Sequence, residues 1–212
     1  MAATETRLLL LGAVAIFEPV NGYQIRRELM SWGVESWANI RPGSIYNGLA
    51  TLAQRGELVR HDLRDGSREV AVYELSDLGR SEFQRLFDEA LVEVRPSAPL
   101  AFQTAISMLP LVERAHATDL LRRRLENLAR SAEDIEVKES VAEHVPPHAL
   151  AMVDYWRQVG AIEHDWLVAL LDRIGRGELS FLGEPMDWTP AEDDPGHQMT
   201  DDRDRYRALL GR

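Results

Sequence analysis

The chain of 212 residues is long enough for one large domain or two small ones, and its 45% hydrophobic and 28% charged content is ordinary for a globular protein. It contains no cysteine, which excludes disulfides, zinc ribbons and thiol nucleophiles and favours a reducing cytoplasm. The net charge of −11 argues against a nucleic-acid partner, but residues 1–80, with nine arginines and ten acidic residues, carry only −1 of it. Exposed charges more than a Debye length apart, about 10 Å at about 0.1 M salt, are largely screened, so local charge decides phosphate binding.

No apolar run reaches the roughly 18–20 residues that a membrane span needs. The longest candidate, residues 8–17, is too short, and it lacks the basic segment and small-residue cleavage site of a signal peptide. We therefore expect a cytoplasmic protein without a membrane partner.

Two helices are predicted within the first 32 residues. Residues 6–17 are apolar almost all round, which indicates a largely buried helix, and the Pro and Gly of residues 18–22 break it. Asn21 is a good N-cap for a second helix over residues 23–32.

A third helix is predicted to have Pro42 in its first turn and to close at Gly56. Ile45, Leu49 and Leu52 follow one another at i, i+4 and i+7. This spacing predicts the buried stripe of the helix.

A β-hairpin and a long helix are predicted next. Residues 58–64 and 69–75 are rich in β-forming side chains, and the segment between them, 65–68, contains the Asp-Gly pair that is a strong hairpin signal. Ser76 then caps a helix that runs to about Val94.

Pro96 and Pro99 mark the start of a second, helical region with predicted helices over residues 100–108, 111–141 and 147–174. A coiled-coil-like seam of alternating 4 and 3 spacing runs along the second of these, at Leu121, Leu125, Leu128, Ala132 and Ile135. Each of the two long helices would extend about 40 Å at about 1.5 Å per residue. Their apolar stripes exceed what one small domain can cover, so we expect a homodimer.

The predicted fold class is mainly α with a small β-hairpin, namely an N-terminal winged helix-turn-helix and a C-terminal dimerisation domain of long helices. The predicted division is residues 1–95 for the first, 96–177 for the second and 178–212 for an acidic, Pro-containing tail. Nine acidic and few apolar residues in the tail favour disorder or an extended arm.

The outer face of the third helix carries candidate base-reading side chains. A turn of about 100° per residue places Asn47, Thr51 and Gln54 opposite the buried stripe. Asn and Gln can bond adenine bidentately, and Thr can contact a base edge or a thymine methyl. Ser44 and the backbone N–H groups at the helix start suit a phosphate. Tyr46 either touches the DNA backbone or packs under the wing.

The hairpin supplies candidate phosphate contacts. Arg64 and Arg68 flank a glycine that permits close approach to a ligand. Three helices followed by such a hairpin are the order of a winged helix-turn-helix, whose third helix fits a major groove about 12 Å wide. The predicted partner is therefore double-stranded DNA.

Several segments resemble the PadR-like transcriptional regulators, and their combined order and spacing is specific. In chain order they are LLLLG at 8–12, NGYQI at 21–25, GSIYNGL at 43–49, LAQRGELV at 52–59, YELSDLGR at 73–80, AISMLP at 105–110, LRRRL at 121–125 and EHDWL at 163–167. The resemblance implies a homodimer in which the last long helix packs against the partner. It also implies a ligand-responsive repressor of transcription.

Two features depart from that family. Asn47 stands where a proline often follows the tyrosine of the recognition helix, so the groove contact can differ there. The wing segment 65–68 has fewer basic residues than is usual, which weakens the expected phosphate affinity of the wing.

Trp32 and Trp37 are the candidate ligand-binding residues. In some members of the resembled family, aromatic residues near this place stack on planar drugs, which would make a small planar aromatic compound the effector. Packing in a core or an interface is the alternative for both, and more so for Trp156 and Trp166 on the long helix.

Two further patterns receive structural interpretations. Residues 122–124 are three consecutive arginines, but Glu126 and Asp119 lie within helical pairing range, which favours an ion-pair face over a basic patch. His144 and His148 have i, i+4 spacing, but two prolines lie between them and break the helix. Neither a metal nor a cofactor is expected.

No P-loop, GxSxG, GxGxxG or HExxH pattern occurs, so we expect no enzyme. The alternative function is a winged-helix module that binds protein without binding DNA. The acidic net charge favours this alternative, whereas the polar outer face of the third helix favours DNA.

Overall fold

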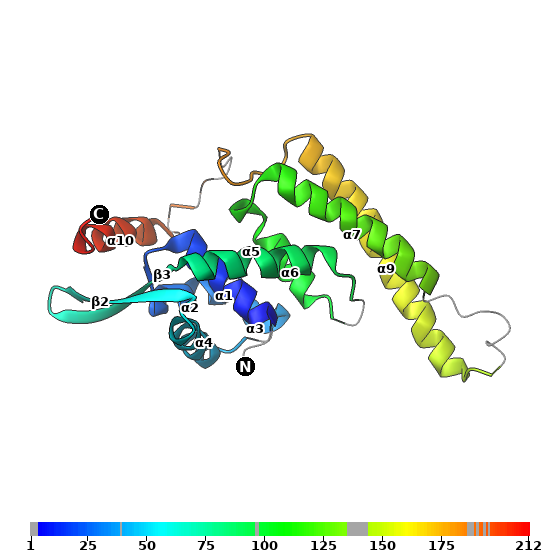
Figure 1. Ribbon diagram of the computed structural model, residues 1–212, viewed down its shortest axis with the longest axis horizontal. Helices are drawn as coiled ribbons and strands as arrows, with labels where there is room; N and C mark the ends of the chain where they lie inside the picture. The colour runs from blue at the N-terminus through cyan, green and yellow to red at the C-terminus, as the bar shows by residue number, and fades with distance from the viewer. Residues whose placement is uncertain are drawn as a thin grey trace. The chain divides into compact units, whose positions relative to one another are not determined.

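The computed structural model describes residues 4–38, 40–95, 98–134, 144–185, 189, 191–192, 194 and 196–212. These residues are mostly helical, with a three-stranded antiparallel sheet (Figure 1). By its internal contacts the chain divides into two compact units, Met1–Phe87 with Met186–Arg212, and Asp88–Pro185.

The first unit has the predicted winged helix-turn-helix architecture. Its helices are α1 (Thr4–Phe17), α2 (Gly22–Ser31), the short α3 (Val34–Trp37), α4 (Pro42–Gln54) and the start of α5 (Asp77–Val92). Its strands are β1 (Val20–Asn21), β2 (Leu58–Asp65) and β3 (Arg68–Leu75), in the order β1-β3-β2. The three helices and the hairpin are thus confirmed, whereas α3 and β1 were not foreseen.

The predicted helix start at Asn21 is confirmed in detail. The Asn21 side chain accepts a hydrogen bond from the backbone N–H of Gln24, and the Gln24 side chain accepts one from the backbone N–H of Asn21. This capping box satisfies two amide groups that the start of a helix would otherwise leave unpaired.

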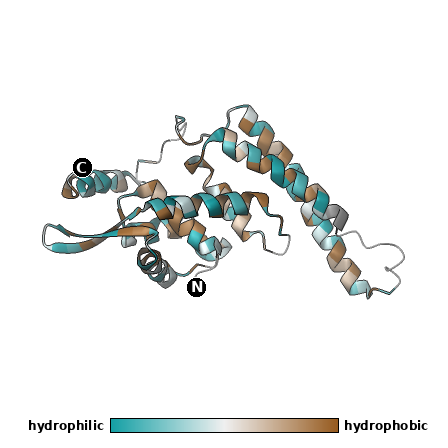
Figure 2. Cartoon of the chain, viewed as in Figure 1, coloured by the Kyte–Doolittle hydropathy of each residue, from teal (hydrophilic) through white to brown (hydrophobic). Residues whose placement is uncertain are grey.

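The core of the first unit lies between α1 and α4. Residues 8–14 of α1 are all buried, and Figure 2 shows this helix as largely hydrophobic. Ile45, Leu49 and Leu52 are at most 3% exposed, which confirms the predicted stripe, and each such side chain contributes about 1.5–3 kcal/mol when fully buried. The helices meet at Gly48, where a Cβ would lie 2.3 Å from Cδ1 of Leu10, so a larger residue there would force the Leu10 side chain to shift.

The hairpin pairs in one unbroken register from Leu58 opposite Leu75 to Asp65 opposite Arg68. Each strand includes one residue more than predicted, which leaves a two-residue turn. Gly66 has a φ of 62° in this turn, a left-handed conformation that glycine adopts at little cost.

The second unit is helical. It contains the end of α5, then α6 (Leu100–Ser107), a 3₁₀ turn over Leu109–Leu111, α7 (Arg114–Asp134) and α9 (Pro147–Gly175), and α7 packs along α9. In the predicted α7 seam, Leu121 and Leu128 are buried and Leu125 is half-buried. The Ala132 side chain and Ile135 lie outside the described residues.

The expected ion-pair face over residues 122–124 is wrong for one of the three arginines. Arg122 and Arg123 are exposed, but Arg124 is buried and pairs with Glu163 on α9, not with Asp119 or Glu126. Its position between Leu121 and Leu128 turns it toward the helix it packs against.

The expectation of an extended or disordered tail is also wrong in part. Gly196–Leu209 form a helix, α10, which packs within the first unit and buries Met199 and Tyr206. Although α10 is largely hydrophilic in Figure 2, these two residues lie seven apart and therefore on one face of the helix.

In the described part of the chain, no helix combines the length and the apolar character needed to cross a membrane.

Candidate nucleic-acid interface

The outer face of α4 is polar and exposed. Ser44, Tyr46, Asn47 and Gln54 are all exposed, on the side of the helix away from its buried stripe. Thr51 is half-buried, and its hydroxyl donates a hydrogen bond to the backbone carbonyl of Asn47 at 2.8 Å. Thr51 can therefore offer its methyl group and an acceptor lone pair, while Asn47 retains a free side-chain amide among the described contacts.

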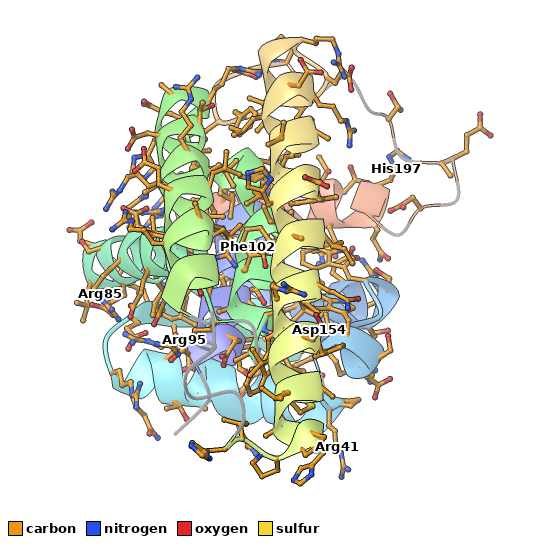
Figure 3. All side chains as sticks on the ribbon, turned by 90° about the vertical axis from the view of Figure 1, so that its right-hand side faces the viewer. Arg41, Arg85, Arg95, Phe102, Asp154 and His197 are labelled. Carbon is orange, nitrogen blue, oxygen red and sulfur yellow. The ribbon has the colours of Figure 1, made fainter. Side chains whose placement is uncertain are left out.

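The start of α4 carries positive charge. Arg41, which is labelled in Figure 3, is the N-cap residue and is exposed, and Pro42 follows in the first turn. The backbone N–H of Ser44 already donates to the carbonyl of Arg41 at 2.9 Å, so the Ser44 hydroxyl is the freer group. The positive end of the helix dipole and the Arg41 guanidinium together favour an anion at this end.

Tyr46 lies against the start of α2. Its ring carbon Cε1 is 3.2 Å from the place where a Cβ on Gly22 would stand, and the side chain is still 44% exposed. The neighbouring Tyr23 is 57% exposed, with the guanidinium of Arg26 5.8 Å from its ring centroid. The exposed Tyr23 and the half-buried Arg26 thus extend the polar surface beyond α4.

The wing, defined here as β2, β3 and the turn between them, contains two arginines that remain available to a ligand. Arg64 and Arg68 are exposed and form no ion pair with any residue that the structure describes. Arg60, in contrast, donates to Asp62 at 2.7 Å, and this hydrogen bond raises the pKa of Arg60 above its usual value. Arg64 and Arg68 are therefore the wing cations best able to meet a phosphate.

Trp32 and Trp37 contact structural partners. The Trp37 indole N–H donates to the backbone carbonyl of Trp32 at 3.0 Å, just at the C-terminal end of α2. The Trp32 ring lies 6.1 Å from that of Phe17, at a tilt of 38°. Both tryptophans are half-buried, so part of each ring still faces solvent.

The comparison with family models falls on this first unit. The model of the Transcriptional regulator PadR-like family matches residues 10–85, which include α2, α4 and the wing. A search of curated protein sequences found no match.

Two solved structures are similar to the chain. PadR of Bacillus subtilis in complex with operator DNA is 18% identical, with a TM-score of 0.33 over 78% of this chain and 98% of that one. The PadR-like transcriptional regulator BC1756 of Bacillus cereus is 17% identical, with a TM-score of 0.35 over 79% of this chain and 94% of that one. Over residues 10–85, the chain is therefore similar to the PadR-like family of transcriptional regulators.

Proposed function

We propose that this regulator binds double-stranded DNA as a homodimer and represses transcription until a small planar aromatic effector binds. The observation that carries the proposal is the pairing of a polar, exposed α4 face with two arginines of the wing that lack ion-pair partners among the described residues.

Within this proposal α4 enters the major groove. Asn47 contacts a base edge, Thr51 supplies its methyl group to a base, and Ser44 and Tyr46 contact the DNA backbone. Arg64 and Arg68 contact phosphates from the wing. Phosphate contacts supply affinity and position the protein, whereas base contacts supply the sequence preference.

The acidic net charge of the chain does not argue against DNA binding by α4 and the wing. The second unit, with 17 acidic and 10 basic residues, carries −7 of the net charge of −11, and exposed charges farther away than a Debye length have little effect at the interface. The charges that decide are those on α4 and the wing.

A homodimer is supported by an apolar stripe on α9 that the second unit covers only at Trp166, which meets the ring of Phe102, among the described residues. Tyr155, Ile162 and Trp166 are exposed, with Ile162 70% exposed, and Val159 between them is half-buried. Their spacing of 4, 3 and 4 residues is that of a coiled-coil seam. A second copy of α9 would cover it.

The effector site is proposed for the second unit. A cavity of ≈ 230 Å³ lies between the end of α5, α7 and α9, and its walls include Val94, Leu128 and Trp156. An apolar cavity of about 150 Å³ can hold benzene, so this one admits a single aromatic ring. Trp32 and Trp37 are the alternative effector site, although their contacts with Phe17 and with each other favour packing.

A gel-shift titration at several salt concentrations tests the central claim. The probe is the DNA upstream of the protein's own gene, and the competitor is unrelated DNA of equal length. We expect preferential binding that weakens steeply with salt, because bound arginines release counterions from phosphate. Equal binding to both DNAs, or none to either, would favour the alternative of a protein-binding winged helix.

A further inference from the structure

The C-terminal helix α10 is tied to the helix-turn-helix by buried contacts. Tyr206 is 2% exposed, and its hydroxyl accepts a hydrogen bond from Nδ2 of Asn21 at 2.8 Å. Nε2 of Gln24 donates to Asp202 at 2.7 Å. Asn21 and Gln24 form the capping box of α2, so α10 engages the donors that this box leaves unused.

The same helix reaches the end of α1. Arg203 donates to the backbone carbonyl of Ile16 at 2.8 Å, in the last turn of α1, where carbonyls lack partners within the helix. Partial burial lowers the pKa of Arg203 from its usual value, but a guanidinium stays charged at any ordinary pH.

Two arginines near the C-terminus then pair with carboxylates of the wing. Arg205 bonds to Asp202 of its own helix at 2.6 Å and also lies 3.1 Å from Asp65 at the end of β2, and Arg212 lies 2.8 Å from Glu74 on β3. Asp65 stands directly opposite Arg68 in the hairpin register and next to Arg64 in the sequence. Its side chain therefore shares a face of the hairpin with Arg68, whereas Arg64 points to the other face.

The wing on its own is expected to bind phosphate weakly. It holds three arginines and four carboxylates, and Asp65 and Glu74 are two of those four. A carboxylate within about 5 Å of a bound phosphate costs affinity through like-charge repulsion, unless a cation neutralises it. Arg205 and Arg212 supply two such cations from outside the wing.

We propose that α10 is part of the nucleic-acid interface: its Arg205 neutralises Asp65, and so allows Arg68, on the same face of the wing, to contact the phosphodiester backbone. This inference rests on the proposed function. In Figure 1, α10 lies on the other side of the wing from α4, so it leaves the outer face of α4 open to DNA and assists binding without blocking it.

A cycle of full-length variants tests the neutralisation. Arg205→Ala should weaken operator binding about threefold to tenfold, the scale of one charge interaction near a protein surface. In an Asp65→Asn background the same change should have no effect, because the repelling carboxylate is gone. Arg207→Ala is the control, since Arg207 is equally exposed and pairs with Asp204 of its own helix at 3.6 Å.

Two results of this variant cycle would contradict the proposal. An equal loss in both backgrounds would mean that Arg205 contacts DNA itself or supports the fold, and no loss in either would mean that Asp65 needs no neutralisation; each result overturns the proposal. Thermal unfolding should be the same for all variants, because an ion pair this exposed adds little stability.

A measurement without DNA distinguishes this proposal from the proposed function. The chain has no cysteine, so Ser67→Cys and Ala208→Cys would place two spin labels, one in the wing turn and one on α10. A single narrow distance that broadens in Tyr206→Ala is expected if α10 docks. A broad distribution in the parent would overturn the proposal whatever DNA the protein binds. A parent protein that shows the narrow distance but binds no DNA would overturn the proposed function. It would then also overturn the proposed role of α10 in DNA binding.

Discussion

Arg124 on α7 donates from Nε to Oε1 of Glu163 on α9 at 2.5 Å, although its side chain is only 2% exposed. The same guanidinium donates to the backbone carbonyl of Glu93 at 2.5 Å, just beyond the end of α5. It also lies 3.8 Å from the ring centroid of Phe102 on α6, which Figure 3 labels. One buried cation therefore joins four helices of the second unit.

We expect Arg124→Met to destabilise the protein by about 3 kcal/mol, because the change leaves the Glu163 carboxylate and helix-end carbonyls without their partner. Urea unfolding would measure the loss. Arg123→Met, one residue away but exposed, should change stability by no more than about 0.5 kcal/mol. Equal losses for the two variants would show that Arg124 is not the joining residue.

Arg124 also shows where sequence reasoning succeeds and where it stops. Leu121, Arg124 and Leu128 follow one another at three and four residues, so the helical period alone places Arg124 on the buried seam. The run of three arginines, with acidic residues within pairing range, obscured that signal. Its partners Glu163 and Glu93 are distant in the chain, so no local sequence pattern predicts that Arg124 contacts them.

The winged helix was predictable because local signals agreed. The Asn21 cap, the 45-49-52 stripe and the Asp-Gly turn each indicate the same element order. Helix α10 was missed because the acidic residues of the tail suggested disorder, although Met199 and Tyr206 share a helical face. Its docking depends on pairings such as Asn21 with Tyr206, which 185 residues of chain separate.

Asn47→Ala should relax the base preference of the protein, at a cost of about 1–3 kcal/mol for the preferred operator if Asn47 makes a bidentate base contact. Competition against operators changed at single base pairs would measure the preference. Because Thr51 already bonds to the backbone of α4, Thr51→Val should cost less than Thr51→Ala, since valine keeps the methyl group.

Arg68→Ala should weaken binding to all sequences alike and reduce the slope of log affinity against log salt by about 1. Arg60→Ala is the matched wing control, since Arg60 is held by Asp62 and should change the slope less. The two roles would be reversed if Arg68→Ala altered the base preference and Asn47→Ala did not.

Ile162→Glu should convert the homodimer to a monomer, because it places a charge in the centre of the exposed α9 stripe. Sedimentation at micromolar concentration would show the change, and operator affinity should fall with it, since two half-sites about 34 Å apart need both copies. Val168→Glu, exposed on the same helix but on another face, should stay dimeric. A parent protein that sediments as a monomer would contradict the proposal.

Planar compounds with a single aromatic ring should quench tryptophan fluorescence and weaken operator binding over the same concentration range. The ≈ 230 Å³ cavity offers Trp156 as a stacking wall, and His164 and Asp165 at its lining as polar contacts. A bound effector can shift the DNA-binding equilibrium only by its difference in affinity for the DNA-bound and free states. Couplings of this kind are typically about 1–3 kcal/mol, or about 5- to 150-fold in operator affinity.

Substitutions of tryptophan by phenylalanine distinguish the two candidate effector sites, because they remove the indole but keep an aromatic ring in the site. Trp156→Phe should abolish the quenching if the ring binds in the cavity, because the reporting indole is gone, while Trp32→Phe should leave the quenching in place. Trp37→Phe removes the indole N–H that bonds to the Trp32 carbonyl, so it should cost about 1 kcal/mol of stability without touching the effector response. The reverse pattern, quenching lost in Trp32→Phe or Trp37→Phe and kept in Trp156→Phe, would place the effector at the end of α2.

Because binding coupling is reciprocal, saturating operator DNA must also weaken effector binding by the same factor. Quenching that is indifferent to DNA would therefore leave the compound as a bound ligand without a regulatory role.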